Sequence, residues 1–355
     1  MNNLSEVLKQ FAIDVETAPY GNGHINETYV LDTNPRTILQ RVNTSIFKNP
    51  DYVMENIVAV TAYLREKIVA AGGDPMRETL TVVPTVDGKP YYLAPDGGAY
   101  RMYYFIEGAK SFDRADTPEL FAASAHGFGK FQKMLADFPA DTLHEVIEKF
   151  HDTGDRLRQF REALEKNASG RADAVRPEID FVLSRADCVT RITDAIADGS
   201  VPLRVTHNDT KLNNVMLDEV TNEPVCVIDL DTVMPGSMLY DFGDALRFGA
   251  STGSEDETDL SKIEFDLTYF EAFTKAFLEE VGDSITPKER ELLPFSAILM
   301  TLECGMRFLA DHINGDIYFR IHRENHNLDR ARTQFKLVAD MEKKMDQMMA
   351  IVAKY

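Results

Sequence analysis

The sequence predicts an α+β protein with two lobes, a small antiparallel β-sheet lobe followed by a mainly helical lobe. Three observations support this prediction. The length of 355 residues exceeds what one hydrophobic core usually supports. Short strand patterns separated by turns are concentrated before residue 107, whereas apolar residues at helical spacing dominate from residue 117 onward. We therefore expect an N-terminal lobe of residues 1–107 and a C-terminal lobe of residues 108–355.

The N-terminal lobe is predicted to begin with a short helix and a pair of strands. Residues 5–13 place apolar side chains on one helical stripe. Strands are expected at residues 27–32 and 36–42, and the turn before them contains Gly21 and Gly23. Because a glycine-containing turn exposes backbone N–H groups, it can approach a phosphate group closely. We therefore consider both glycines as candidates for nucleotide binding.

One long helix and three strands complete this lobe. The helix is predicted at residues 51–71, because Asn49-Pro50 precedes it and Gly72-Gly73 follows it. The strands are expected at residues 79–83, 91–93 and 99–106. The last strand leads through Phe105, Ile106 and Glu107 into the second lobe.

The C-terminal lobe is predicted to be built from helices. Thr117 is a suitable N-cap for the first of them. Apolar residues at helical spacing predict helices at residues 118–137, 143–150, 152–166, 177–198, 267–281, 287–308 and 329–353. An acidic loop at residues 254–259 separates two of these helices and is expected to be solvated.

Polar side chains gather where a β-hairpin interrupts the helices. Strands are expected at residues 215–217 and 225–228, with a turn at residues 221–224. Asp209 and Asn214 precede this hairpin, and Asp229 follows it. The hairpin folds the loop back beside the strand end, so these three side chains can converge.

The chemistry of this trio suits phosphoryl transfer. The Asp209 carboxylate can accept a proton, while an amide oxygen and a carboxylate, from Asn214 and Asp229, can hold a hard divalent cation. Phosphoryl transfer requires an oriented hydroxyl group, a base, and Mg²⁺ to neutralise developing charge. Asp231 lies two residues after Asp229, also at the end of the second strand.

This spacing resembles the H-x-D-x-x-x-x-N catalytic loop of protein kinases, which is followed by a metal-binding Asp. The order and context are similar to the aminoglycoside phosphotransferase group, with the run IDLDT in place of DFG and a later Asp241-Phe242-Gly243-Asp244 segment. The resemblance implies a protein-kinase-like fold in which Asp209 is the catalytic base. It also implies Mg²⁺ on Asn214 and Asp229, with ATP as the phosphoryl donor.

The N-terminal lobe resembles a kinase less closely. The Gly21–Gly23 turn is similar to the hairpin that covers the phosphates, and Phe105, Ile106 and Glu107 resemble the hinge whose backbone meets adenine. The strand lysine that pairs the phosphates is missing, because Gln40 occupies its position. Either the adjacent Arg41 turns inward and replaces it, or the lysine's role is absent.

An arginine inside an apolar helix is a further candidate. Arg307 lies in the run LECGMRFLAD near the end of the helix predicted at residues 287–308. A buried charge needs a partner, since an unpaired one is costly. Arg307 therefore either forms a structural ion pair with a carboxylate or binds substrate oxygens.

Several longer runs resemble the bacterial N-acetylhexosamine 1-kinase family over residues 20–334. These runs are YGNGHINETY, NTSIF, PLRVTHNDTKLNNVMLD, IDLDTVMPGSMLYDFGDALRFGAS and ECGMRFLADHINGDIYF. The resemblance implies transfer from Mg-ATP to the anomeric hydroxyl of N-acetylglucosamine or N-acetylgalactosamine. It assigns His24, Arg307 and Tyr318 to the sugar and leaves Asp231 between sugar and metal. Asp241 and Asp244 would brace the catalytic loop.

Composition limits the partners that we expect. A formal net charge of −20 repels polyanions, so we expect no nucleic acid. The resemblance implies small-molecule partners, a sugar and ATP. The three cysteines do not form a disulfide framework, which fits a reducing cytoplasm. No apolar run approaches the ~20 residues of a membrane span, so we expect no membrane partner.

Two other functions are compatible with the same residues. A related small-molecule kinase would act on choline, homoserine or an aminoglycoside, although His24 and Arg307 disfavour a cationic acceptor. A pseudokinase would bind nucleotide or sugar without transfer. The missing strand lysine favours the pseudokinase, whereas the complete set of Asp209, Asn214 and Asp229 opposes it.

Overall fold

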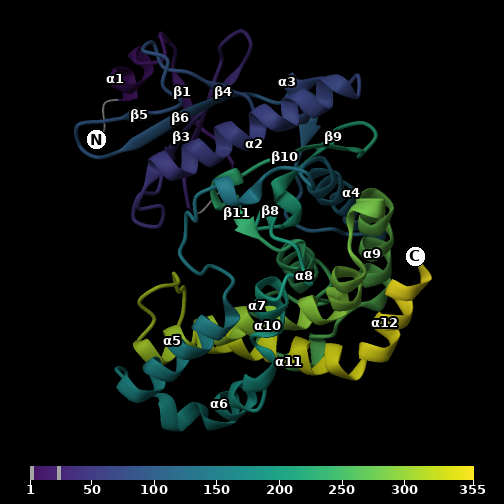
Figure 1. Ribbon diagram of the computed structural model, residues 1–355. Helices are drawn as coiled ribbons and strands as arrows, with labels where there is room; N and C mark the ends of the chain where they lie inside the picture. The colour runs from purple at the N-terminus through teal and green to yellow at the C-terminus, as the bar shows by residue number, and fades with distance from the viewer. Residues whose placement is uncertain (1–3, 22–24) are drawn as a thin grey trace.

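The computed structural model describes residues 4–21 and 25–355. The strands of the N-terminal part gather with one long helix at one end of the molecule, and the remaining helices pack at the other end (Figure 1). This arrangement confirms the predicted α+β fold with a small antiparallel sheet and a mainly helical C-terminal region. The predicted residues Gly23 and His24 lie outside the described part of the chain.

The N-terminal sheet is antiparallel, with strand order β1-β2-β3-β6-β4 and β5 also paired to β6. Its strands are β1 (Thr17–Pro19), β2 (Glu27–Leu31), β3 (Thr37–Val42), β4 (Val82–Val83), β5 (Tyr92–Leu93) and β6 (Ala99–Tyr104). Successive side chains of a strand point to opposite faces. Leu39 and Met102 therefore pack toward α1 (Leu4–Lys9), while Val42 and Tyr103 pack toward α2.

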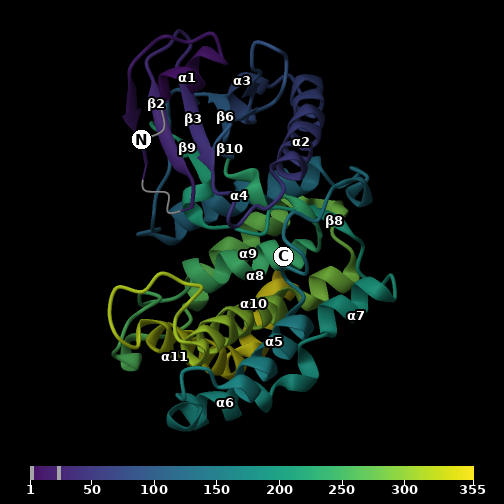
Figure 2. The ribbon, with the colours of Figure 1, turned by 90° about the vertical axis from the view of Figure 1, so that its left-hand side faces the viewer.

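The helix α2 (Pro50–Ala70) runs beside the strands (Figure 2) and begins and ends close to the predicted bounds. The Asn49 side chain caps it by accepting a hydrogen bond from the amide of Asp51. Gly72, at φ +80°, provides the left-handed turn that follows the helix. A short helix, α3 (Pro75–Glu78), was not predicted.

The C-terminal region surrounds one long apolar helix, α10. Its helices are α4 (Pro118–Met134), α5 (Thr153–Lys166), α6 (Arg176–Leu183), α7 (Arg191–Ala197), α8 (Met238–Gly249), α9 (Leu267–Val281), α10 (Pro287–Asn314), α11 (His326–Lys343) and α12 (Met345–Lys354). Among the described residues, α10 alone is long and apolar enough to cross a membrane, and 89% of its most apolar window is buried inside the protein.

Three helix predictions were wrong in extent. Residues 143–150 form no helix, because the Asn56 side chain pairs with both the amide and the carbonyl of His144. The helix expected at residues 177–198 is divided into α6 and α7, which lets Val182 and Ile192 face the same core. The helix expected at residues 329–353 breaks at Lys344 between α11 and α12.

Three small strand pairs support the central loop of the C-terminal region. β9 (Val215–Asp218) and β10 (Pro224–Val227) form the predicted hairpin, and β7 (Ala109–Lys110) joins β9. β8 (Arg204–Thr206) pairs with β11 (Met234–Gly236). Apolar residues of this hairpin share one core cluster with α2 and α4. Because the cluster crosses residue 107, the lobe boundary at that residue stays a prediction.

Candidate active site

The buried carboxylate of Asp241 holds the start of the 207–214 loop by hydrogen bonds to its backbone. Asp241 lies on α8 and is 1% exposed. Its oxygens accept hydrogen bonds from the amides of His207 at 2.9 Å and Asn208 at 2.7 Å, and from Gln132 Nε2 at 2.6 Å. Burial raises the pKa of the Asp241 carboxyl. This geometry supports the expectation that Asp241 braces the loop.

The imidazole of His207 connects the loop to the end of β10. It is fully buried, its Nε2 lies 2.8 Å from the carbonyl of Ile228, and its Nδ1 lies 3.2 Å from the amide of Asp209. The first residue of the loop thereby ties Asp209 to the strand that precedes Asp229. Thr232 strengthens the tie by donating a hydrogen bond of 2.6 Å to the carbonyl of His207.

The structure brings Asp209, Asn214 and Asp229 together. Asn214 Nδ2 donates to the carbonyl of Asp209 at 2.8 Å and lies 3.3 Å from its Oδ2. The amide of Ile228 donates to the carbonyl of Asn214 at 2.8 Å, which places Asn214 next to Asp229. Asp229 has φ +58° and opens a short turn, residues 229–232, which we call the Asp229 turn.

The trio offers oxygen ligands to a divalent cation. Burial, Asp231 and Asp209 together raise the pKa of the Asp229 carboxyl to about 6, so a cation beside it would be favoured. Neither the Asp229 carboxylate nor Asn214 Oδ1 has a hydrogen-bond or ion-pair partner in the part of the chain that the structure describes. Among all the described residues, no group of three or more His, Cys, Asp or Glu side chains is placed to hold a metal ion. A set of two protein ligands, Asn214 and Asp229, fits Mg²⁺, which keeps waters and phosphate oxygens among its ligands.

Lys211 is a functional candidate that our sequence reasoning missed. Its Nζ forms an ion pair of 2.6 Å with Asp209 Oδ1. Burial lowers the pKa of Lys211, but Asp209 and Asp244 outweigh burial and hold this pKa above its ordinary value. Its position two residues after Asp209 in the same short loop was the available signal.

Arg101 is the second missed residue, and it occupies the neighbourhood of the absent lysine. Gln40 and Arg101 are directly paired across β3 and β6, and both face the α2 side of the sheet. Gln40 Oε1 accepts hydrogen bonds from Arg101 Nε at 3.0 Å and Nη2 at 2.8 Å. The guanidinium is 1% exposed and forms an ion pair with Asp231.

Arg41 lies on the opposite face of the sheet from this group. Its guanidinium pairs with Glu27 at 3.1 Å and its side chain is 35% exposed. The alternation of a strand places Gln40 inward and Arg41 outward. The structure therefore does not bring Arg41 to the predicted phosphate site.

We expect Arg41→Ala to leave the KM for ATP and kcat close to those of the unaltered protein. Removing Arg41 breaks a solvated pair with Glu27, and such pairs contribute at most about 1 kcal/mol to stability. Steady-state kinetics at varied ATP concentration test this expectation. A large rise in the KM for ATP would return Arg41 to the phosphate contacts.

The carboxylate of Asp231 is already occupied by protein groups. Oδ1 pairs with Arg101, Oδ2 accepts a hydrogen bond of 2.7 Å from Asn26 Nδ2, and the residue is 3% exposed. The family resemblance left two roles open for Asp231, a contact with the sugar or a contact with the metal. The structure supports neither role, because both oxygens have protein partners and the side chain is buried.

The segment after β6 connects the two parts of the chain. Glu107 forms an ion pair with Arg36, whose guanidinium also lies 4.1 Å from the centre of the Phe105 ring. The amide of Phe105 donates to the carbonyl of Arg36, and Ile106 is buried. The amides of Ile106 and Glu107 have no backbone partner among the described residues. Their contact with adenine stays a prediction, as does the contact of Gly21 with phosphate.

Arg307 has no hydrogen-bond or ion-pair partner within the described residues. Its guanidinium carbon lies 5.7 Å from the ring centre of Phe150 and 5.5 Å from that of Phe319. The nearby Glu303 is committed elsewhere, to His151 at 2.8 Å and Thr153 at 2.6 Å. The structural ion pair considered for Arg307 is therefore not formed, and its donors remain available to a ligand.

The surroundings of Arg307 reach the 207–214 loop through His151. The Nε2 atom of His151 lies 3.3 Å from the carbonyl of Asn208, which precedes Asp209. On its other side, His151 pairs with Glu303, one helical turn before Arg307. His151 therefore connects the helix that carries Arg307 to the 207–214 loop.

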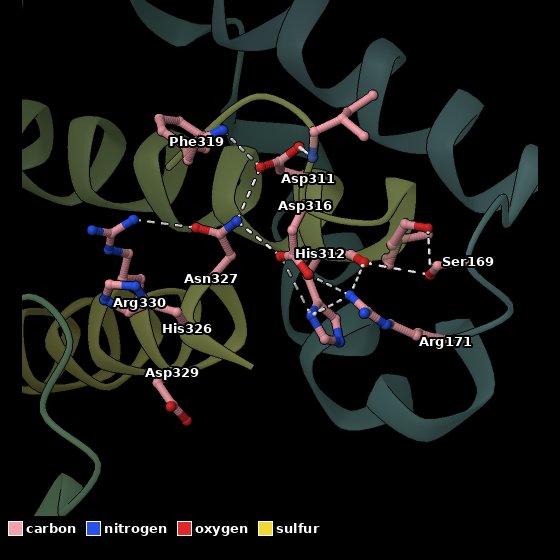
Figure 3. Close-up of polar contacts among 12 residues, drawn as sticks. Ser169, Arg171, Asp311, His312, Asp316, Phe319, His326, Asn327, Asp329 and Arg330 are labelled. Atoms are coloured by element: carbon pink, nitrogen blue, oxygen red, sulfur yellow. Dashed lines mark hydrogen bonds and ion pairs between the residues drawn. The ribbon is translucent and has the colours of Figure 1, made fainter. Parts of the chain in front are cut away.

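A network of carboxylates holds the segment that carries Tyr318 and Phe319 (Figure 3). Asp311 accepts hydrogen bonds from the amides of Tyr318 at 2.8 Å and Phe319 at 2.9 Å, and from Asn327 Nδ2 at 3.0 Å. Asn327 Nδ2 also donates to Asp316 at 2.9 Å. These bonds fix Phe319 beside Arg307. Tyr318 is 66% exposed, and its contact with a sugar stays a prediction.

A cavity of about 460 Å³ lies beside the 207–214 loop. Leu212, Arg247, Glu255 and Tyr269 contribute to its wall. Arg247 is paired with Asp244 at 2.9 Å and with Glu255 at 2.9 Å. Asp244 therefore holds an arginine at this cavity and does not contact the loop backbone as Asp241 does.

The Asp209, Asn214 and Asp229 side chains, with Lys211 paired to Asp209, offer the kinds of groups that phosphoryl transfer uses. Residues 16–279 match the model of the APH phosphotransferase enzyme family, and the chain therefore belongs to this family. It is therefore a phosphotransferase.

Solved structures with the same fold include three proteins of related description. A microcompartment-associated aminopropanol kinase is 16% identical, with a TM-score of 0.67 and 98% of each chain covered. An amicoumacin kinase in complex with AMP-PNP, Ca²⁺ and Ami is 15% identical, with a TM-score of 0.57, and the match covers 96% of this chain and 94% of that one. A choline/ethanolamine kinase family protein from Mesorhizobium loti is 17% identical, with a TM-score of 0.57 and full coverage of both chains.

Proposed function

We propose that the enzyme phosphorylates the anomeric hydroxyl of N-acetylhexosamines, N-acetylglucosamine and N-acetylgalactosamine, with Mg-ATP as the donor. The observation that carries this proposal is the guanidinium of Arg307, which has no hydrogen-bond or ion-pair partner within the described residues and lies 5.7 Å and 5.5 Å from the ring centres of Phe150 and Phe319. A guanidinium has five donors and no acceptor, so it suits hydroxyl and carbonyl oxygens. The rings of Phe150 and Phe319 can cover the apolar face of a sugar.

In the proposed reaction, Asp209 orients the anomeric hydroxyl and accepts its proton. The transition state of phosphoryl transfer is loose, so the reaction requires little more of this carboxylate than to orient the acceptor oxygen. Lys211, paired with Asp209, supplies positive charge beside the transferred group. Asn214 and Asp229 would hold Mg²⁺, which neutralises charge on the phosphates.

Charge around Arg307 weighs against cationic acceptors such as choline or an aminoglycoside. Arg156 lies close enough to Arg307 that each disfavours the charge of the other, and burial with this repulsion lowers the pKa of Arg156. A cationic ligand would add a third positive charge. A pseudokinase is disfavoured because Asp209, Asn214 and Asp229 are assembled and Lys211 accompanies them.

An acceptor panel tests the proposed function. The protein is incubated with Mg-ATP and one of N-acetylglucosamine, N-acetylgalactosamine, choline, homoserine or an aminoglycoside, and ADP release is followed. We expect release with the two hexosamines, accompanied by loss of reducing-sugar reactivity because the anomeric position becomes blocked. Turnover with choline, homoserine or an aminoglycoside alone would contradict the sugar assignment. ATP binding without turnover on any acceptor would favour the pseudokinase.

Removal of divalent ions is expected to abolish transfer. Asn214 and Asp229 offer oxygen ligands, which suit Mg²⁺ or Mn²⁺ and not a soft metal. Activity is measured after EDTA treatment and again after addition of Mg²⁺, with Zn²⁺ as a comparison. Full recovery with Mg²⁺ supports this metal site, whereas transfer that persists without any divalent ion would exclude it.

A further inference from the structure

The sheet places a cation near the position of the absent strand lysine, but on a different strand. Gln40 stands where the lysine is expected, and its direct neighbour across the sheet is Arg101 on β6. Gln40 Oε1 accepts two hydrogen bonds from Arg101, at 3.0 Å and 2.8 Å, and Gln40 Nε2 lies 3.1 Å from Thr28 Oγ1 on β2. Gln40 on β3 therefore connects the guanidinium of Arg101 on β6 to Thr28 on β2.

The other end of Arg101 reaches the Asp229 turn. Arg101 Nη1 forms an ion pair with Asp231 Oδ1, and both side chains are buried, at 1% and 4% exposure. Asp231 Oδ2 accepts a hydrogen bond from Asn26, whose own Oδ1 accepts one of 3.0 Å from the amide of Asn43. Asp231 on the Asp229 turn thus contacts both Arg101 on β6 and Asn26, which precedes β2.

A buried ion pair is rarely maintained for stability alone. Removing two charges from water costs much of what their attraction returns, and apolar residues of similar volume often stabilise a fold equally well. The rigid fork of a guanidinium, however, fixes the geometry of every group that it binds. The pair therefore suits a role in which relative placement matters.

We propose that Arg101 is a positioning residue for phosphoryl transfer, which compensates for the missing strand lysine by fastening the N-terminal sheet to the Asp229 turn through Asp231. At 1% exposure, its side chain offers almost no accessible surface for a direct contact with a phosphate. Through Asp231 it holds the sheet, and Asn26 beside it, in a set position relative to Asp229. The inference rests on the ATP and metal parts of the proposed function and is independent of the acceptor.

The test compares Arg101→Met and Asp231→Asn with a matched control, Arg77→Met. Arg77 on α3 also joins the N-terminal part to the hairpin, through an ion pair of 2.6 Å with Asp218. Its side chain is 37% exposed, however, and its partner Asp218 lies outside the Asp229 turn. Two quantities are measured for each variant. They are the Kd for Mg-ATP by calorimetry without acceptor, and kcat/KM for ATP and for the acceptor that the panel identifies.

We expect Arg101→Met to lower kcat/KM for ATP by about a hundredfold, the scale of a 1 Å misplacement of reacting groups. The Kd for Mg-ATP should rise, the acceptor KM should stay the same, and Arg77→Met should behave like the unaltered protein. Asp231→Asn should show the same pattern. The double variant should be no worse than the poorer single variant, because both changes break one connection.

Two results would overturn the proposal. One is a folded Arg101→Met protein that binds Mg-ATP and turns it over normally, which would reduce the pair to a contribution to stability. The other is an additive loss in the double variant. If Arg101→Met does not fold, Asp231→Asn decides alone, and normal ATP kinetics in that variant reject the proposal. Because the calorimetric measurement needs no acceptor, a failure of the sugar assignment leaves the test intact.

Discussion

Replacing Asp209 with asparagine is expected to lower kcat by about a hundredfold or more, the scale of lost general acid–base help. Asparagine keeps the size of the side chain and cannot accept the acceptor's proton. The carboxylate is 23% exposed and contacts Asn214 and Lys211, and its loop holds no second carboxylate. The backbone of the loop is held by His207 and Asp241, so the fold should persist.

The measurement is ADP release at saturating substrates, with a thermal melt to confirm the fold. Asp141→Asn is a suitable control, because Asp141 is exposed and lies in a short turn after α4. The control should retain normal kcat. Normal turnover in Asp209→Asn would remove this residue from the mechanism and leave positioning and charge as the sources of catalysis.

Replacing Arg307 with alanine is expected to reduce kcat/KM for the sugar about ten- to a hundredfold, which corresponds to roughly 1.5–3 kcal/mol for a charged hydrogen-bond donor. The KM for ATP should stay nearly unchanged. Within the described residues Arg307 has no ion-pair partner, so its removal leaves no buried carboxylate unpaired. Stability should therefore change little.

Arg290→Ala provides the control on the same helix. Arg290 lies near the start of α10 and donates to the carbonyls of Val352 and Tyr355, both at 3.4 Å. Its loss should leave both substrates' kinetics unchanged. A stable Arg307→Ala protein that binds N-acetylhexosamine normally would refute the placement of the acceptor. The cavity beside Leu212 would then be the next place to seek it.

Local patterns were sufficient for the parts of the site that lie close together in the chain. Asp209, Asn214 and Asp229 are separated by one short loop and one tight hairpin, so their convergence follows from strand and turn geometry. The same reasoning predicted α2 with its caps and the alternation that separates Gln40 from Arg41. Each of these depends on interactions within a few residues or on the period of a single strand.

Breaks in the helices were not predictable in the same way. Residues 143–150 have a helical apolar pattern, yet Asn56, distant in the chain, satisfies their backbone at His144. Residues 177–198 are helical in pattern at both ends, and the chain bends between them because both ends bury apolar side chains in one core. Tertiary packing outweighs local propensity at such positions.

The sequence by itself therefore determined the two-part α+β fold and the acidic trio with its phosphotransferase chemistry. Only the tertiary structure decided which cation stands near the position of the absent lysine. Arg101 lies 61 residues from Gln40 in the chain, and Asn26 lies 205 residues from Asp231. Partners this far apart meet through strand order and the packing of the sheet against the Asp229 turn. Arg307 shows the same limit, because its apolar surroundings in the sequence predicted a buried, paired charge, whereas the structure leaves the residue half-buried and, within the described residues, without an ion-pair partner.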